Sequence, residues 1–500
     1  MSEQYILAID QGTTGTTVIL FDRRSQITAK VYQEFTQYYP KAGWVEHDAQ
    51  EIWEGTKDLL GRIFHEAEIT PAQVAAIGVT NQRETVVLWD RKTGEPVTRA
   101  IVWQCRRTAG MCDELRRQGL ESLFVERTGL LLDAYFSGTK LKWIFDQHPE
   151  LKERAKKGEL AFGTIDSWLI YKLTGGSVHC TDYTNASRTL LFNLAELRWD
   201  PELLDVLGIP QAVLPEVRSN SEVYGYTADL GVLPAGIPIS GAAGDQQAAL
   251  FGQACYEPGT VKATFGTGAF ILMNTGTSLI ASRNRLLTTI AWGLNGSVEY
   301  ALEGSVFVAG AAVQWLRDGL GVIEKAAETE ELALSVPDTN GLYFVPSFVG
   351  LGAPHWDPYV QGMIMGITRG TTKAHLTRAA LEAIVYQTKD VVDVMLADAG
   401  LPLTELKVDG GASVNNFICQ FLADMTQTQV QRPQIFETTA LGAAYLAGLA
   451  VGFWKDQDEI RKLWQVDGTY QPQVSAAERL RLLQGWANAV KSAKTWVVSM

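Results

Sequence analysis

An α/β fold built from two similar lobes is predicted by three features of the sequence. The chain has 500 residues, which is too long for one compact core, so two or three domains are expected. Short β-branched runs that end in Gly, Asp or Asn alternate with helical patterns, as in α/β layers. A strand, a Gly/Thr bend and a second strand near residue 6 recur near residue 261. This repeat suggests two lobes that meet near residues 252–258, although Gly and Thr are common in unrelated hairpins too.

The predicted strands fall into an N-terminal and a C-terminal group. Between them lie helices such as 49–67, which has apolar residues at three-and-four spacing. The apolar run at 440–454 is shorter than the ~20 residues that a membrane span needs, so a buried helix is expected. The strand-like runs are residues 5–10, 16–22, 74–80, 85–90 and 237–245 in the first group, and 260–266, 269–274, 286–292, 298–304 and 406–411 in the second.

Composition excludes several classes of protein. The net charge of −13 disfavours binding to a nucleic-acid backbone, which needs basic patches. Five cysteines without CxxC spacing argue against a disulfide framework or a structural zinc site and fit a reducing, cytoplasmic environment. No signal peptide is visible at the N-terminus. A soluble globular protein is therefore expected.

Several familiar catalytic motifs are absent. The sequence contains no GxxxxGK[ST] phosphate loop and no GxGxxG fingerprint, so nucleotide binding would need another design. No HExxH or GxSxG pattern occurs. The acidic and histidine residues at 46–48 are consecutive and cannot easily converge on one metal ion, so they are interpreted as a loop or a helix cap.

The two Gly/Thr bends are candidate phosphate sites. Backbone N–H groups and hydroxyls at such bends form a concave cluster of donors, here with Thr13 and Thr14 in the first and Thr267 in the second. Asp10, at the end of the first strand, would project toward a Mg²⁺ ion on the phosphate. The plain alternative is that the first bend only closes a hairpin.

Three strand-turn-helix segments add further candidates. Gly411 follows a strand in the Asp-Gly-Gly turn, and Gly310 opens a helical run with Gln314 one turn along the same face, so a ligand could approach the backbone at both. Asp245 opens a third helix. It is predicted to be either a helix N-cap or a general base that accepts a proton from an attacking hydroxyl, with Gln246 beside it.

Arg83 and Glu84 follow a strand and offer donors and acceptors for vicinal hydroxyls. An exposed ion pair at the strand end is the commoner meaning of such a pair. Three aromatic residues near turns, Trp103, Tyr135 and Phe270, either fill the core or form an apolar wall for a small polyol.

These segments together resemble the FGGY family of carbohydrate kinases from end to end. Residues 135–147 fit one signature of the family at every constrained position, and residues 362–382 fit the second. The segments 81–85, 103–107, 182–189 and 244–252 resemble the members that phosphorylate glycerol rather than the pentulose kinases. The resemblance implies two actin-like (ribonuclease H-like) lobes around an ATP cleft, with residues 1–252 on the glycerol side and residues 253–500 on the nucleotide side.

The resemblance also implies ATP-dependent phosphorylation of glycerol to sn-glycerol 3-phosphate, with Mg²⁺, in a cytoplasmic homodimer or homotetramer. Asp245 is the implied catalytic base, and Asp10 and Asp245 neighbour the metal. The implied glycerol residues are Arg83, Glu84, Trp103, Tyr135, Asp245, Gln246 and Phe270. The implied nucleotide residues are Thr13, Thr14, Thr267, Gly310, Gln314, Gly411 and Asn415.

The chain departs from the family pattern at a few positions. Thr17 stands where many members have an arginine in the first hairpin. Pro234 and Gly236 replace a pair that binds fructose 1,6-bisphosphate in enterobacterial relatives, and Val232 replaces a phosphorylated histidine of other relatives. Two rival functions stay open: a kinase of the same family acting on a sugar or longer polyol, and an actin-like ATPase that forms filaments or acts as a chaperone.

Overall fold

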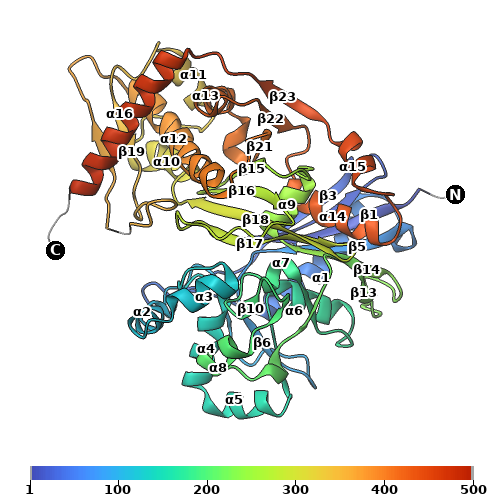
Figure 1. The fold of residues 1–500 in the computed structure, drawn as a ribbon. Coiled ribbons are helices and arrows are strands. Elements are labelled where there is room, and N and C mark those ends of the chain that lie inside the picture. The colour runs from blue at the N-terminus through green and yellow to red at the C-terminus, as the bar shows by residue number, and fades with distance from the viewer. Residues whose placement is uncertain (1–2, 358, 497–500) are drawn as a thin grey trace.

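The computed structural model describes residues 3–357 and 359–496. Two large sheets form the centres of two lobes, and a smaller helical region lies at the end opposite the C-terminal helix (Figure 1). In the described part of the chain, no helix is both long and apolar enough to cross a membrane.

The N-terminal sheet has six strands. Strand β1 is antiparallel to β2, which pairs with β3, while β5 and β14 continue the sheet on the other side of β1 in parallel. Helix α1 (Ala49–Glu66) packs on this sheet with its apolar stripe buried, as its sequence pattern predicts. The strands in spatial order are β13 (Ser221–Tyr226), β14 (Pro238–Gly244), β5 (Val74–Asn81), β1 (Tyr5–Gln11), β2 (Gly15–Phe21) and β3 (Ile27–Glu34).

The C-terminal sheet repeats this strand order and adds one strand, β17, at an edge. Strand β15 is antiparallel to β16, which pairs with β18, while β21 and β22 extend the sheet in parallel on the other side of β15. The repeated hairpin of the sequence is therefore the centre of two sheets of the same topology. The strands in order are β17 (Leu287–Leu294), β18 (Ser297–Val306), β16 (Ala269–Gly276), β15 (Thr260–Phe265), β21 (Glu405–Asp409), β22 (Val430–Pro433) and β23 (Val466–Tyr470).

Each lobe contributes one helix that packs on the sheet of the other lobe. Helix α9 (Asp245–Gly252) follows β14 of the first sheet and contacts β15, β16 and β17 of the second. Helix α14 (Thr438–Ala450) follows β22 of the second sheet and packs on β1, β5 and β14 of the first. The predicted buried helix at 440–454 is thus confirmed over most of its length, and its apolar residues belong to a core shared by both lobes.

Helices α9 and α14 touch at two glycines in a reciprocal manner. A Cβ atom on Gly442 would lie 1.8 Å from the carbonyl oxygen of Ala248, and one on Gly252 would lie 2.0 Å from that of Thr438. Only glycine permits backbones to approach so closely. The lobes therefore meet along a contact that excludes side chains.

The region between β5 and β13 forms a smaller unit with its own apolar core. The strand-like run at 85–90 belongs here, because β6 (Val87–Asp90) pairs with β8 (Leu160–Gly163) and not with the large sheet. The other short ladders are β4 (Glu46–His47) with β7 (Ala100–Ile101), β9 (Cys180–Asp182) with β12 (Glu216–Arg218), and β10 (Phe192–Asn193) with β11 (Arg198–Trp199). Its helices are α2 (Ala109–Arg117), α3 (Glu121–Thr128), α4 (Ser137–Gln147), α5 (Pro149–Lys156), α6 (Ile165–Leu173), α7 (Tyr183–Ala186) and α8 (Pro201–Leu207).

The remaining helices cover the C-terminal sheet. The longest, α12 (Lys373–Ala399), packs against α11 (Glu328–Leu334) and α13 (Asn416–Thr426), and the apolar face predicted for α13 is buried. Helix α10 (Gly310–Gln314) leads into a π-helical turn at Trp315–Gly319. The others are α15 (Gln457–Leu463) and α16 (Ala476–Thr495), with the short ladder of β19 (Tyr343–Val345) and β20 (Met363–Met365).

Candidate active site

The candidate catalytic residues lie at one edge of the N-terminal sheet. Asp10 is near the carboxyl end of β1, Arg83 follows β5, and Asp245 follows β14. These three strands are parallel to one another, so their carboxyl ends meet at the same edge, where α/β sheets commonly bind ligands. The topology therefore gathers residues that are far apart in the sequence.

Asp245 is the first residue of α9 and does not cap that helix. Gly244 occupies the N-cap position, and the Asp245 carboxylate accepts the N–H of its neighbour Gln246, at 2.7 Å. The interpretation of Asp245 as a helix cap is therefore wrong. Its side chain is 31% exposed, which leaves it accessible to solvent.

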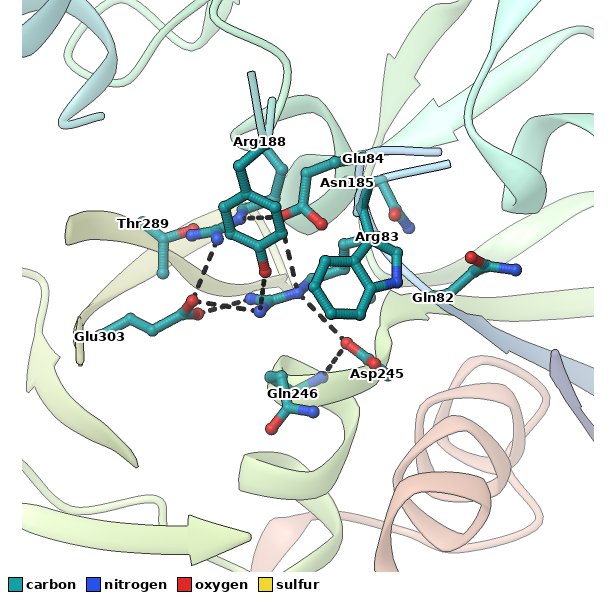
Figure 2. Close-up of polar contacts among 12 residues, drawn as sticks. Gln82, Arg83, Glu84, Asn185, Arg188, Asp245, Gln246, Thr289 and Glu303 are labelled. Carbon is teal, nitrogen blue, oxygen red and sulfur yellow. Dashed lines mark hydrogen bonds and ion pairs between the residues drawn. The ribbon is translucent and has the colours of Figure 1, made fainter. Parts of the chain in front are cut away.

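Two groups contact the Asp245 carboxylate, and both do so at Oδ1. Arg83 Nε lies 3.2 Å from this oxygen, and the Gln246 N–H donates to it as well (Figure 2). Among the described residues, none forms a hydrogen bond with Oδ2. One oxygen thus fixes the carboxylate while the other is left for a ligand, an arrangement suited to a general base.

Arg83 and Glu84 are buried, at 3% and 1% exposure. The interpretation of this pair as an exposed ion pair is therefore wrong. Glu84 has a φ of 62°, a left-handed conformation that is uncommon for a residue other than glycine and that costs about 1–3 kcal/mol. Such strain persists only where the surroundings hold the backbone, and it often marks a functional site.

Three aromatic rings border this cluster, and each is half-buried. Trp103 and Tyr135 pack edge to face with their centroids 5.6 Å apart, and the Arg83 guanidinium lies over the ring of Phe270 at 6.0 Å. Arg83 Nη2 donates to the Tyr135 hydroxyl at 3.4 Å. The structure therefore brings all three predicted wall residues to the same place.

Gln246 is linked to the C-terminal sheet. Lys262 of β15 is fully buried, and its Nζ donates to Gln246 Oε1 and, at 2.8 Å, to Thr264 Oγ1. Burial lowers the pKa of Lys262 to about 8, with Asp409 and Asp245 opposing that shift. Because the lysine occupies the amide oxygen of Gln246, the amide NH₂ group is left to donate to a ligand.

Asp10 fits a divalent cation. Burial, followed by the negative charges of Asp245 and Glu437, raises the pKa of Asp10 to about 8, so its charge is disfavoured without a nearby cation. No group of three or more His, Cys, Asp or Glu residues arranged for a metal is present among the described residues. Mg²⁺ commonly takes one or two carboxylates and completes its shell with phosphate oxygens and water, so Asp10 and Asp245 suit it.

The predicted nucleotide residues gather mostly around the second hairpin. The bend at Gly266–Gly268 docks on the start of α10, where Gly310 N–H donates to Gly266 O at 3.0 Å. A Cβ on Gly410 would lie 2.5 Å from Phe265 O, so the turn that holds Gly411 abuts the same strand end. Thr267 and Gln314 are exposed nearby.

Asn415 and the first bend have partners of their own. Asn415 caps α13 by accepting the Ile418 N–H and donates to Thr329 Oγ1 at 3.1 Å. In the first hairpin Thr14 is exposed, while Thr13 Oγ1 accepts a hydrogen bond from Trp103 Nε1 at 2.9 Å. Trp103 therefore links the predicted polyol wall to a predicted phosphate bend.

In the segment at 46–48 the expected helix cap is confirmed at Asp48, whereas Glu46 and His47 form a short strand and not a loop. Asp48 caps α1 by accepting the N–H groups of Gln50 and Glu51. His47 is buried, with Nε2 2.7 Å from Gln37 Oε1 and Nδ1 3.3 Å from Gln82 Nε2. The polar side-chain atoms of His47 and the Asp48 carboxylate therefore have partners within the protein.

Sequence interpretation missed four buried polar residues of the site. None was singled out, although Arg188 lies in the 182–189 segment and Glu303 in a predicted strand. For Lys262 and Glu303, a charged residue inside a predicted strand of apolar residues is the available signal, since such charges are rarely buried without partners. The four are Arg188, Gln247, Lys262 and Glu303.

The chain belongs to the FGGY family of carbohydrate kinases. Models of the N-terminal and C-terminal domains of that family match residues 5–252 and 261–451. The chain is similar to glycerol kinase 2 of Thermotoga maritima, with 58% identity over 99% of both chains. It is also 58% identical to the glycerol kinase of Geobacillus kaustophilus, over 98% of this chain and 99% of that one.

Solved structures share the fold. The crystal structure of Plasmodium falciparum glycerol kinase with ADP has a TM-score of 0.93 and 36% identity, over 98% of each chain. Xylulose kinase of Lactobacillus acidophilus has a TM-score of 0.89 over 99% of each chain, but at 23% identity it supports the fold alone. The predicted fold of two actin-like lobes is confirmed.

Proposed function

We propose that this chain phosphorylates glycerol to sn-glycerol 3-phosphate with ATP. The observation that carries the proposal is the convergence of Arg83, Glu84, Tyr135 and Asp245 on one partly buried site bordered by aromatic rings. Hydrogen-bonding groups on one side and apolar rings on the other suit a small polyol, which has hydroxyls and a carbon backbone. Relatives named glycerol kinases, at 58% identity over nearly the whole chain, support the same substrate.

Each side chain has a role in this proposal. Arg83 donates to glycerol hydroxyls, Glu84 accepts from them, and the free amide NH₂ of Gln246 donates to another. Tyr135 adds a hydroxyl partner. Trp103 and Phe270 pack against the carbon backbone.

ATP would lie on the C-terminal side, with residues 1–252 holding the polyol and residues 253–500 the nucleotide. Backbone N–H groups and hydroxyls at the two bends would cradle the phosphates. Mg²⁺, next to Asp10 and Asp245, would neutralise charge on the phosphate oxygens. The nucleotide contacts proposed are Thr13, Thr14, Thr267, Gly310, Gln314, Gly411 and Asn415.

The chemical step proposed is a direct transfer. Asp245 Oδ2 accepts the proton of a terminal glycerol hydroxyl while the oxygen of that hydroxyl attacks the γ-phosphorus of ATP in line, and ADP leaves. Arg83 holds Oδ1 and so aims the other oxygen at the substrate. Closure of the lobes would exclude water, which otherwise competes as the acceptor.

A panel of polyols and sugars tests the substrate. Initial rates with glycerol, erythritol, xylulose and ribulose are compared at fixed MgATP, and glycerol is expected to have the highest kcat/KM. A preference for xylulose would contradict the proposal and favour another activity within the family. ATP hydrolysis that is independent of glycerol and accompanied by polymerisation would instead favour an actin-like filament or chaperone.

A homodimer or homotetramer in the cytoplasm is also proposed. All five cysteines are free and buried, which fits a reducing compartment where ATP is abundant. Sedimentation or light scattering would measure the assembly directly.

A further inference from the structure

Four buried charges form a closed ring beside the proposed polyol site. Arg83, Glu303, Arg188 and Glu84 follow one another with alternating sign, and we call them the charge ring (Figure 2). Each member is at most 3% exposed. Only two of the four, Arg83 and Glu84, belong to the proposed glycerol contacts.

Three of the four contacts around the ring are hydrogen bonds. Arg83 donates to Glu303 through both terminal nitrogens, at 2.5 and 3.1 Å. Arg188 Nη2 donates to Glu303 Oε1 at 3.0 Å, and Arg188 Nε donates to Glu84 Oε1 at 2.6 Å. Arg83 Nε lies 3.8 Å from Glu84 Oε1 and closes the ring. Each carboxylate therefore lies between two guanidinium groups.

The ring crosses the boundary between the lobes. Glu303 is on β18, inside the C-terminal sheet. Arg83 and Glu84 follow β5, and Arg188 follows α7, all in the N-terminal half. A residue of the C-terminal sheet thus holds the guanidinium of an N-terminal residue in the proposed polyol site.

Stability alone is a poor explanation for this arrangement. Apolar residues of similar volume are often as stabilising as a buried ion pair, because desolvation offsets the attraction. The four charges cancel, so removing one leaves an unpaired buried charge, whereas removing an opposite pair leaves the rest balanced. Burial alone would raise the pKa of Glu303, but Arg188 and Arg83 outweigh that effect and lower it to about 2, so Glu303 stays charged.

Arg188 also contacts the aromatic side of the site. Its guanidinium lies 5.6 Å from the ring centre of Tyr135 and 5.3 Å from that of Phe136. It thus fixes the ring of Tyr135 and, through its ion pair, the carboxylate of Glu84, whose backbone is in the left-handed conformation. Two proposed glycerol contacts are held by one arginine that is not itself proposed to touch glycerol.

We propose that Arg188 and Glu303 are positioning residues for polyol recognition. Glu303 holds the fork of Arg83, and Arg188 holds Glu84 and Tyr135, so the polyol site is complete only when β18 is docked on the N-terminal lobe. This inference rests on the proposed function, because it assumes that Arg83 and Glu84 bind the polyol.

Glu303→Gln is the first test. The variant keeps the shape of the side chain but leaves Arg83 and Arg188 with excess buried positive charge. The KM for glycerol is expected to rise about tenfold or more, the effect of losing one partner of a buried charge pair. The KM for MgATP is expected to change by less than about threefold, since in this proposal the ring touches the polyol residues and not the nucleotide residues.

The matched control is Tyr300→Phe. Tyr300 lies three residues away on β18, and its hydroxyl donates to Leu194 O in the N-terminal half at 3.0 Å. This variant also loses a buried contact between the lobes but leaves the ring intact. It is expected to lower the melting temperature without changing the glycerol KM. Equal effects on glycerol KM in both variants would mean that the ring acts only as a structural contact and would overturn the proposal.

The double variant Arg188→Gln/Glu303→Gln gives a second readout. It removes one charge of each sign and leaves Arg83 and Glu84 balanced. Each kcat/KM for glycerol is expressed relative to the wild type. The relative value of the double variant is expected to be about fivefold or more above the product of the relative values of the two single variants. Independent, multiplicative effects would contradict a ring that acts as a unit.

Arg188→Lys covers the case in which Glu303→Gln does not fold. Lysine keeps the charge but offers a single ammonium that cannot bridge Glu84 and Glu303 as a planar fork does. A glycerol KM raised about fivefold or more is expected, and an unchanged value would overturn the proposal. If the wild type prefers another polyol, glycerol is not the substrate and the proposed function is wrong. The same variants are then assayed with the preferred polyol, so that the role of the charge ring is tested separately.

Discussion

Arg83 and Asp245 meet through one atom of each, with Arg83 Nε 3.2 Å from Asp245 Oδ1. The Gln246 N–H occupies the same oxygen at 2.7 Å, so the carboxylate has one fixed and one open oxygen. A base that removes a proton must be held still and yet keep a lone pair free. This contact provides both conditions and leads to the first prediction.

Asp245→Asn is expected to fold and bind glycerol but to lose turnover. The amide is close in shape to the carboxylate and cannot accept the proton, so kcat is expected to fall by a factor on the order of 10² or more. Steady-state kinetics gives kcat, and calorimetry with glycerol gives binding. A near-normal kcat in a correctly folded variant would remove Asp245 from the role of base.

Local motifs explain which part of the site could be predicted from the sequence. The two bends, the Arg83-Glu84 pair and Asp245 each lie within a short segment whose residue types indicate a chemistry, so they could be named without a structure. The role of Asp245 could not be decided from the sequence, because a shift of one residue in the start of α9 decides whether Asp245 or Gly244 is the N-cap. In the structure Gly244 is the N-cap.

The charge ring could not be predicted in the same way. Arg188 and Glu303 are 115 residues apart and come from different lobes, so only the packing of β18 on the N-terminal half brings them together. The contact between α9 and α14 likewise joins residues that are far apart in the sequence. Gly252 and Gly442 look like ordinary helix-end and mid-helix glycines until the two backbones are seen to touch.

Gly442→Ala is expected to destabilise the protein. Its methyl group would lie 1.8 Å from Ala248 O, which forces α9 and α14 apart, and overpacking of this kind typically costs about 1–3 kcal/mol. Gly110→Ala in α2 is the matched control, because nothing lies within 4 Å of its added Cβ. That control is expected to stabilise by up to about 1 kcal/mol, since alanine favours the helix.

Urea unfolding of the two glycine variants gives the comparison. Opposite signs of the change in the free energy of unfolding are expected. If Gly442→Ala were as stable as Gly110→Ala, the close contact between the lobes would not limit their packing.

Lys140 is expected to make stability depend on pH. Its buried Nζ donates to Phe136 O at 2.9 Å and to Tyr135 O, and burial lowers its pKa to about 7. The unfolded value is about 10.4, so between these two pH values the unfolded chain binds more protons than the folded chain. Stability contributed at this site therefore rises with pH, by up to about 1.4 kcal/mol per pH unit, from about pH 7 to about pH 10.

Lys140→Met removes this titration. Below about pH 7, the difference in free energy of unfolding between wild type and variant is expected to be constant. Above about pH 7, the free energy of unfolding of the wild type is expected to rise relative to that of the variant. Ser137→Ala is the control, because it removes a neighbouring buried hydrogen bond to Glu84 O without removing a titratable group. Its difference from wild type should therefore not depend on pH. A pH-independent difference for Lys140→Met as well would show that Lys140 has the same protonation state when folded and unfolded.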